Sequence, residues 1–431
     1  MIIYFQFSFL LILFFLLLST GHAQTSQQNK TYEAQQLIDV SKNSILQIRV
    51  IENTTNKKSS IGSGFYISSN GLIATNYHVV ASVVQAPDSY HLEYLDYEGN
   101  SGSIELVDVD VVHDLAIVTT KNKSESKKPL DLAEIDAQQG EKLFAFGNPH
   151  DLGLTVVEGT NNGLLEKARN EKIHYTGSLN AGMSGGPTVN GNGEVVGINV
   201  STAGNQISFL VPVKFLSELK NKAENEIQNP DKNFHERIEK QLFDDQQEFF
   251  SNLLKGTWPK EKIGELYLPA EINNQIKCWG NANNDEDRLI DKSVINCSTE
   301  DRIFISREFS TGQVHYSYSN VVNRDLTTIR FYEMYQAGLT PRRPRNSVSE
   351  EDVTNFKCHS DFLLIIDRSW RAHSCVRRYK KYPSLFDLVF DLTMIGEDSR
   401  GIGVVLLVSG IDQDMSQKLI ARFVQEMTWQ P

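Results

Sequence analysis

The hydrophobic and polar positions of this chain change their pattern along its length. Between about Leu37 and Val211, short runs of β-branched or aromatic residues are bounded by Gly, Asn or Asp, as in "GSGFYIS", "IELVDVDVV" and "KLFAFG". Runs of this kind are typical of β-strands. Because no long helical period interrupts them, the segment is predicted to form a β-sandwich or barrel rather than alternating strands and helices.

The period changes at Pro212, where a proline followed by strong helix formers predicts a helix that ends at Asn229-Pro230. A second helix is predicted after it, ending near Gly256 and Pro259. Its apolar residues fall on one stripe at helical spacing: Phe234, Ile238, Leu242, Phe249 and Leu253. We interpret this stripe as a packing surface rather than a cofactor site.

Residues 260–431 are predicted to form a second, smaller α+β domain. A helix is expected from Asp412 to Met427, at the end of the chain. Strands are expected in five segments: "RIFISREF", "QVHYSYSNVV", "TIRFYEMY", "FLLIIDR" and "GVVLLVSG". The predicted organisation is therefore a signal peptide (1–23), a β domain (24–228), a helical linker (229–259) and this C-terminal domain (260–431).

The first residues form an almost continuous apolar run from Ile2 to Leu18. Small residues follow at Gly21 and Ala23, as a signal peptidase requires, and predict cleavage after Ala23. The alternative is that the run is retained as an anchor, since it is also long enough to span a bilayer. An association with a membrane is expected only in that case. Either interpretation predicts export of the remaining chain, to a periplasm or the exterior.

All four cysteines lie in the second half of the chain, and their even number suits disulfides in an oxidising compartment. Four cysteines allow three connectivities; pairing of neighbours closes the shortest loops and is the prediction, namely Cys278 with Cys297 and Cys358 with Cys375. Cys358-His359 and His373-x-Cys375 resemble a zinc set by residue type, but adjacent Cys-His lacks the usual ligand spacing. No metal or cofactor is therefore expected.

The formal net charge of −12 argues against nucleic acid as a general partner, since phosphate binding needs clustered positive charge. Two local basic runs, "TPRRPR" (residues 340–345) and "VRRYKK" (residues 376–381), are interpreted as solvated loop charge.

Three stretches of the β segment bring together the residue types of nucleophilic catalysis. "GLIATNYHVV" places His78 after a strand in a short polar turn, "VVHDLAIV" places Asp114 at the start of a strand, and "LNAGMSGGP" supplies Ser184. A serine hydroxyl needs a base, histidine can serve near neutral pH, and a carboxylate orients the imidazole. The glycines around Ser184 allow the N–H groups of Gly182 and Ser184 to converge on a developing oxyanion.

These motifs, together with "FGNPHDLGLTVVEGTNNGLL", resemble the trypsin-like serine peptidases of the HtrA type over about residues 35–220. The resemblance implies a chymotrypsin-like double β-barrel and a serine endopeptidase that acts on proteins or peptides, such as exported or misfolded ones. It implies that His78 is the general base, Asp114 its orienting carboxylate, Ser184 the nucleophile and Gly182 an oxyanion donor. The oligomeric state of the family is not carried over.

The chain also departs from the family. Met183 stands where asparagine or aspartate is usual, and no PDZ carboxylate-binding loop is found after the peptidase segment. A substrate pocket for aliphatic side chains is expected around Ser178, Leu179 and Ile207, because "TGSLN" holds no acidic partner for Lys or Arg. The alternative function is a catalytically inactive trypsin-like scaffold that only binds. The C-terminal domain is open to a third interpretation, a module that delivers the peptidase to a substrate or surface.

Overall fold

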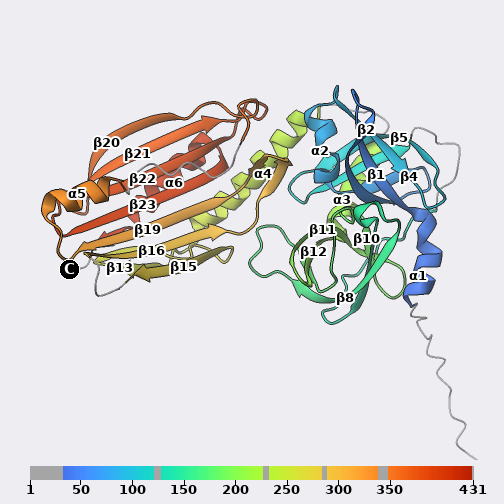
Figure 1. Cartoon of the computed structure of the whole chain (residues 1–431), viewed down its shortest axis with the longest axis horizontal. Helices are drawn as coiled ribbons and strands as arrows, with labels where there is room; N and C mark the ends of the chain where they lie inside the picture. The colour runs from blue at the N-terminus through green and yellow to red at the C-terminus, as the bar shows by residue number, and fades with distance from the viewer. Residues whose placement is uncertain (1–32, 121–127, 227–232, 284–288, 338–347, 430–431) are drawn as a thin grey trace, which may run out of the picture. The chain divides into compact units, whose positions relative to one another are not determined.

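The structure, a computed structural model, describes residues 33–120, 128–226, 233–283, 289–337 and 348–429 (Figure 1). The predicted signal peptide, the basic run at 340–345 and part of the acidic loop at 281–287 lie outside these ranges. No helix within them has both the length and the apolar character needed to cross a bilayer.

Two closed antiparallel barrels of six strands make up the first half of the described chain. The order around the first barrel is β1 (Ile45–Glu52), β2 (Lys57–Tyr66), β3 (Leu72–Thr75), β6 (Leu115–Thr120), β5 (Ser101–Asp110) and β4 (Tyr90–Leu95). The order around the second is β10 (Pro187–Val189), β11 (Val195–Gly204), β12 (Ile207–Pro212), β9 (Ile173–Tyr175), β8 (Thr155–Leu164) and β7 (Lys142–Gly147). The predicted chymotrypsin-like double barrel is confirmed.

Short helices flank the barrels: α1 (Ala34–Ser41), the 3₁₀ turns η1 (Lys42–Ser44) and η2 (Pro149–Asp151), α2 (Tyr77–Gln85) and α3 (Val213–Glu226). The structure corrects two expectations here. Leu37 lies buried in α1, not in a strand, and His78 lies in the first turn of α2 rather than in a polar turn. The valines of α2 have weak helix propensity, and packing of its buried side chains against the first barrel overrides it.

The long helix α4 (Phe234–Lys255) confirms the predicted apolar stripe as a packing surface. The Asn233 side chain caps it by accepting a hydrogen bond from the Glu236 amide at 3.4 Å. Its first half contributes Ile238 and Leu242 to a core shared with the first barrel. Its second half contributes Phe249, Phe250 and Leu253 to the core of the C-terminal region. One helix therefore belongs to two hydrophobic cores.

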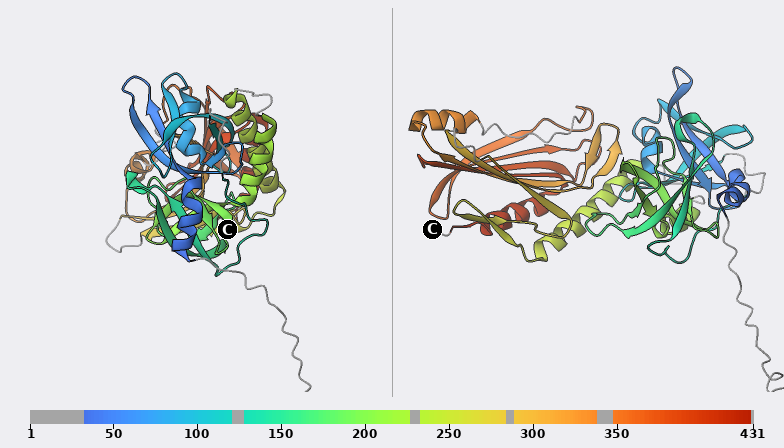
Figure 2. Two further views of the ribbon diagram at one scale, coloured as in Figure 1. Left: turned by 90° about the vertical axis from the view of Figure 1, so that its right-hand side faces the viewer. Right: turned by 60° about the horizontal axis from the view of Figure 1, so that its bottom comes forward.

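A seven-stranded antiparallel sheet dominates the C-terminal region, and α4 and α6 (Gln413–Gln425) lie on one of its faces (Figure 2). Its order is β15 (Ile276–Asn283), β16 (Ile290–Thr299), β19 (Val314–Asn323), β23 (Arg400–Ile411), β22 (Phe386–Ile395), β21 (Arg368–Arg378) and β20 (Lys357–Ile365). Smaller pairings join β13 (Lys260–Ile263), β14 (Leu266–Pro269) and β24 (Thr428–Trp429), and the hairpin β17 (Ile303–Ser306) with β18 (Phe309–Thr311).

The segment "TIRFYEMY" is a helix, α5 (Thr328–Ala337), and its prediction as a strand was wrong. Phe331 and Tyr335 are buried one turn apart, and their rings stack with centroids 5.7 Å apart. An aromatic pair at positions i and i+4 stabilises a helix, although the same residues favour strands by composition.

Both predicted disulfides are present, Cys278–Cys297 and Cys358–Cys375. Each joins residues directly opposite each other on neighbouring antiparallel strands. Because β15 and β20 are the two edge strands of the sheet, each edge is covalently tied to the strand beside it.

Candidate active site

The structure brings His78 and Asp114 into direct contact. The Nδ1 atom of His78 lies 2.6 Å from Asp114 Oδ2, and the backbone N–H of His78 donates to Asp114 Oδ1 at 2.8 Å. Asp114 occupies the turn between β5 and β6 with φ +58°, a left-handed conformation that Asp tolerates better than most residues. This two-point contact fixes the orientation of the imidazole ring.

The backbone of Asp114 is itself anchored to the start of α2. Its carbonyl oxygen accepts hydrogen bonds from the Tyr77 amide at 3.1 Å and from the Asn76 side-chain amide at 2.8 Å. Asn76 is fully buried, so this network joins the β5–β6 turn to α2 inside the first barrel.

Burial acts to lower the pKa of His78, but the charge of Asp114 and its hydrogen bond outweigh burial and raise the pKa above the ordinary value of 6.5. His78 keeps 28% of its side chain exposed, which leaves the ring accessible from one side. A histidine in this setting can accept a proton near neutral pH and is stabilised once it is charged.

Ser184 lies in the loop that precedes β10, and two glycines there take left-handed conformations. A Cβ at Gly182 (φ +96°) would lie 2.5 Å from the Asn148 carbonyl oxygen, and one at Gly185 (φ +84°) 2.3 Å from that of Ser63. Both positions therefore require glycine for conformation and for space.

Ser63 of the first barrel fixes the loop of the second. Its amide donates to the Ser184 carbonyl at 2.8 Å, and its hydroxyl donates to the Gly182 carbonyl at 2.7 Å. The Ser184 hydroxyl donates to the Val200 carbonyl at 3.3 Å, and within the described ranges it makes no hydrogen bond to His78. Catalytic hydrogen bonds are often formed only when substrate is bound.

Two backbone N–H groups beside Ser184 are available to a ligand. In the loop from Leu179 to Gly186, the amides of Met183, Gly185 and Gly186 donate to carbonyl oxygens of the chain. Among the described residues, the amides of Gly182 and Ser184 make no hydrogen bond. These are the two groups expected to bind an oxyanion.

The residues expected to form the substrate pocket lie on neighbouring segments of the second barrel. Leu179 is buried with Met183 in a core cluster, and its amide donates a hydrogen bond to Ser208 Oγ at 3.2 Å. Ser178 and Ile207 are exposed. Their role as a specificity pocket stays a prediction.

A cavity of about 360 Å³ opens beside His78, and sequence analysis missed part of its lining. The segment from Glu300 to Phe304 in the C-terminal region lines it together with His78 and Asp114. The Phe304 ring meets the His78 ring edge-on, with centroids 6.0 Å apart. No local signal in "DRIFIS" could have indicated this contact, because it depends on folding of distant segments.

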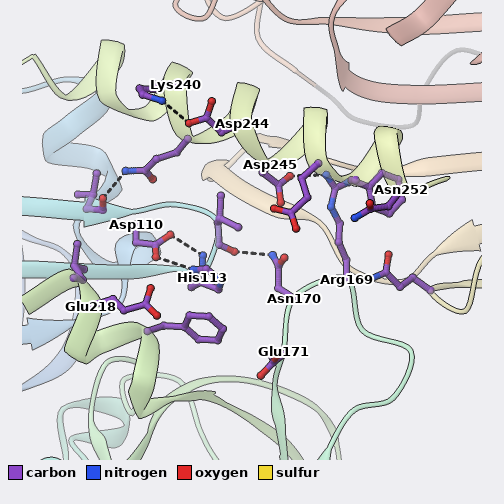
Figure 3. Close-up of a pocket in the computed structure, with 18 of the residues that line it drawn as sticks. Asp110, His113, Arg169, Asn170, Glu171, Glu218, Lys240, Asp244, Asp245 and Asn252 are labelled. Carbon is purple, nitrogen blue, oxygen red and sulfur yellow. Dashed lines mark hydrogen bonds and ion pairs between the residues drawn. The ribbon is translucent and has the colours of Figure 1, made fainter. Parts of the chain in front are cut away.

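A larger cavity of about 1310 Å³ lies between β5, α3 and α4, and its walls carry many charged side chains (Figure 3). Several of these are paired, including Asp110 with His113 at 2.7 Å and Arg169 with Asp245 at 2.5 Å. Asn170 donates to the Val112 carbonyl at 2.7 Å and so supports the segment that leads to Asp114. Many of the charged groups in these walls are therefore engaged with one another.

Cys358, His373 and Cys375 lie close enough together to suggest a metal site, but the two cysteines are bonded to each other. The two sulfur atoms form a disulfide and are not available as thiolate ligands. The His373 Nε2 atom lies 3.0 Å from Cys375 Sγ.

Comparisons with known proteins show which proteins the barrel segment resembles. Residues 62–198 match the model of the trypsin-like peptidase domain. The chain is 36% identical over 177 residues to "Serine protease HTRA3" of Homo sapiens, covering 38% of this chain and 39% of that protein. It is 35% identical over 162 residues to a "Probable periplasmic serine endoprotease DegP-like" of Rickettsia conorii, covering 34% and 29%.

Among solved structures, a serine endoprotease from Yersinia pestis is 24% identical with a TM-score of 0.38, over 44% of this chain and 65% of that one. Deg5 is 26% identical with a TM-score of 0.37, over 42% and 90%. The chain spans less than half the length of the HTRA3 and DegP-like proteins named above. The resemblance to HtrA-type, trypsin-like serine peptidases is confirmed for the segment that they share.

Proposed function

We propose that this protein is a serine endopeptidase in which Ser184 is the nucleophile, His78 the general base and Asp114 the carboxylate that orients His78. The observation that carries the proposal is the two-point contact between His78 and Asp114 at 2.6 and 2.8 Å, in a chain whose Ser184 loop requires glycine on both sides. The alternative, an inactive scaffold, is disfavoured because no member of the set is replaced.

In this proposal, the Ser184 oxygen attacks the carbonyl carbon of the scissile peptide bond while His78 Nε2 takes the hydroxyl proton. The amides of Gly182 and Ser184 stabilise the negative charge that develops on the carbonyl oxygen. The imidazolium, stabilised by Asp114, then gives its proton to the leaving amine. A water molecule, deprotonated by His78, hydrolyses the acyl-enzyme and restores Ser184.

The substrates in this proposal are exported or misfolded proteins with aliphatic side chains at the Ser178, Leu179 and Ile207 pocket. Two disulfides in the C-terminal region support an oxidising, exported location. We further propose a peptidase domain at 24–228, a helical linker at 229–259 and a C-terminal domain at 260–431.

A fluorophosphonate probe tests the assignment, because it reacts only with an activated serine. We expect full-length protein to be labelled and Ser184→Ala to be unlabelled, with the fold retained by circular dichroism. Ser103→Ala is the matched control, since Ser103 is an exposed serine on β5 that lies outside the proposed catalytic and substrate residues, and it should be labelled. Labelling of Ser184→Ala, or of no variant, would contradict the proposal.

A further inference from the structure

We propose that Phe304, in the C-terminal region, is a specificity-determining residue that contacts an apolar substrate side chain close to the scissile bond. This inference rests on the proposed peptidase function and extends the substrate site beyond the two barrels. The cavity beside His78 is walled on one side by barrel residues and on the other by the segment from Glu300 to Phe304.

Aromatic contacts hold the side chain of Phe304 against the first residues of α2. Its ring lies edge-on to His78, with centroids 6.0 Å apart and planes at 73°, and edge-on to Tyr77, with centroids 6.4 Å apart. Phe304 is only partly buried, so one side of the ring is left for a ligand. A substrate residue that lies beside His78 in this cavity would meet that side.

The position of Phe304 is fixed on both sides along β17. The Tyr77 hydroxyl donates to the Ile305 carbonyl at 3.0 Å. Ile303 and Ile305 are buried at 3% and 0% exposure, in the same core as the valines of α2. A phenylalanine held in this way contributes contact area with little loss of conformational freedom on binding.

Two further contacts hold the segment that leads into β17. Asp301 accepts a hydrogen bond from the Arg169 amide at 3.0 Å and pairs with Lys172 at 2.5 Å. Both partners belong to the second barrel. The segment from Glu300 to Phe304, which forms the C-terminal wall of the cavity, therefore contacts each barrel and not only α2.

The far end of α2 is attached to the C-terminal region as well. Gln85 donates to the Tyr382 hydroxyl at 3.0 Å and accepts from Lys381 at 3.0 Å. The C-terminal region therefore contacts both ends of the helix that carries His78. This makes the wall part of the site and not a loosely placed neighbour.

The chemistry of the cavity favours an apolar side chain. Val112, Val200 and Phe304 provide apolar surface next to His78. The charges of the C-terminal wall are largely compensated, since Asp301 pairs with Lys172 and Glu300 with Lys277 at 2.7 Å. Arg302 is exposed to solvent.

The test uses full-length protein with Phe304→Ala, Phe304→Leu and the control Phe362→Ala, an exposed phenylalanine on β20 that does not line the cavity. Pairs of fluorogenic peptides differ by Leu or Gly at one of the three positions before the cleaved bond. At the position that Phe304 contacts, Phe304→Ala should reduce kcat/KM for the Leu peptide by about 10-fold, mainly through KM. The Gly peptide should change less than about twofold.

Phe304→Leu should restore most of the preference for leucine, and Phe362→Ala should behave as wild type. Labelling by a small fluorophosphonate should be unchanged in all variants, because the probe does not fill the cavity. Equal loss for the Leu and Gly peptides at every position, or no loss, would overturn the inference while the peptidase assignment stood. Absence of labelling in wild-type protein would instead refute the peptidase function and this inference together.

Discussion

Substitution of Arg169 should reveal how strongly the barrels and the C-terminal region depend on each other. Arg169 lies between β8 and β9, and its side chain is only 2% exposed. Its guanidinium pairs with Asp245 of α4 at 2.5 Å (Figure 3). It also donates to the Gly312 carbonyl and lies 4.2 Å from the centre of the Phe249 ring. Methionine would keep the apolar contact with Phe249 and remove the charge.

The expected loss of stability follows from the charge of Asp245, which the substitution leaves without its partner. Removing one partner of a buried ion pair costs about 3–5 kcal/mol, because the other charge stays buried without compensation. Asp245 keeps 16% of its side chain exposed, which allows some hydration and favours the lower part of that range. We therefore expect Arg169→Met to reduce the free energy of unfolding by about 3 kcal/mol.

Two probes can follow this loss separately in urea. All four tryptophans lie in the C-terminal region or just before it, so tryptophan fluorescence reports on that region: Trp258, Trp279, Trp370 and Trp429. Fluorophosphonate labelling at Ser184 reports on the barrels. The two transitions should coincide in wild-type protein, whereas in Arg169→Met both midpoints should fall and separate.

Lys142→Met is the matched control, since it breaks an exposed ion pair to Glu158 in the second barrel. An exposed pair contributes about 1 kcal/mol or less, so both midpoints should stay close to those of wild type. If Arg169→Met changed no more than Lys142→Met, the argument that Arg169 couples the two regions would be refuted.

The remaining predictions concern the proposed chemistry. The kcat/KM for a peptide substrate should fall as pH decreases through the pKa of His78, which lies above 6.5, because the protonated imidazole cannot accept the Ser184 proton; a profile that is flat down to pH 5 would identify another base. Cleavage of denatured casein, mapped by mass spectrometry, should occur mainly after aliphatic residues, because Ser178 and Leu179 offer no carboxylate to a basic side chain; a majority of cuts after Lys or Arg would refute the aliphatic pocket.

The barrels could be predicted from the sequence because each strand is a short apolar run that ends at a turn residue. The helices α2 and α5 could not be predicted, because the same rule assigns their residues to strands. The valines around Val79 and the aromatic residues around Phe331 favour strands by composition. In the folded protein, packing of these side chains against the first barrel and the seven-stranded sheet determines a helix instead.

The candidate site also has a part that could be predicted from the sequence and a part that could not. His78, Asp114 and Ser184 each lie in a short motif whose residue types reveal the chemistry. Phe304 lies in an ordinary alternating strand sequence, and its place beside His78 depends on how distant segments pack. Local patterns can therefore indicate the reacting groups but not the wall that surrounds them.

The disulfides at the two edges of the seven-stranded sheet have a consequence for the lifetime of the molecule. A peptidase cleft binds polypeptide in an extended form through main-chain hydrogen bonds, and an edge strand that frays presents such a segment. β20 is exposed along almost its whole length, and Cys358 ties it to β21. Cys278 does the same for β15. In the proposed peptidase, these two disulfides would therefore keep the edge strands of one copy out of the cleft of another and so limit autolysis.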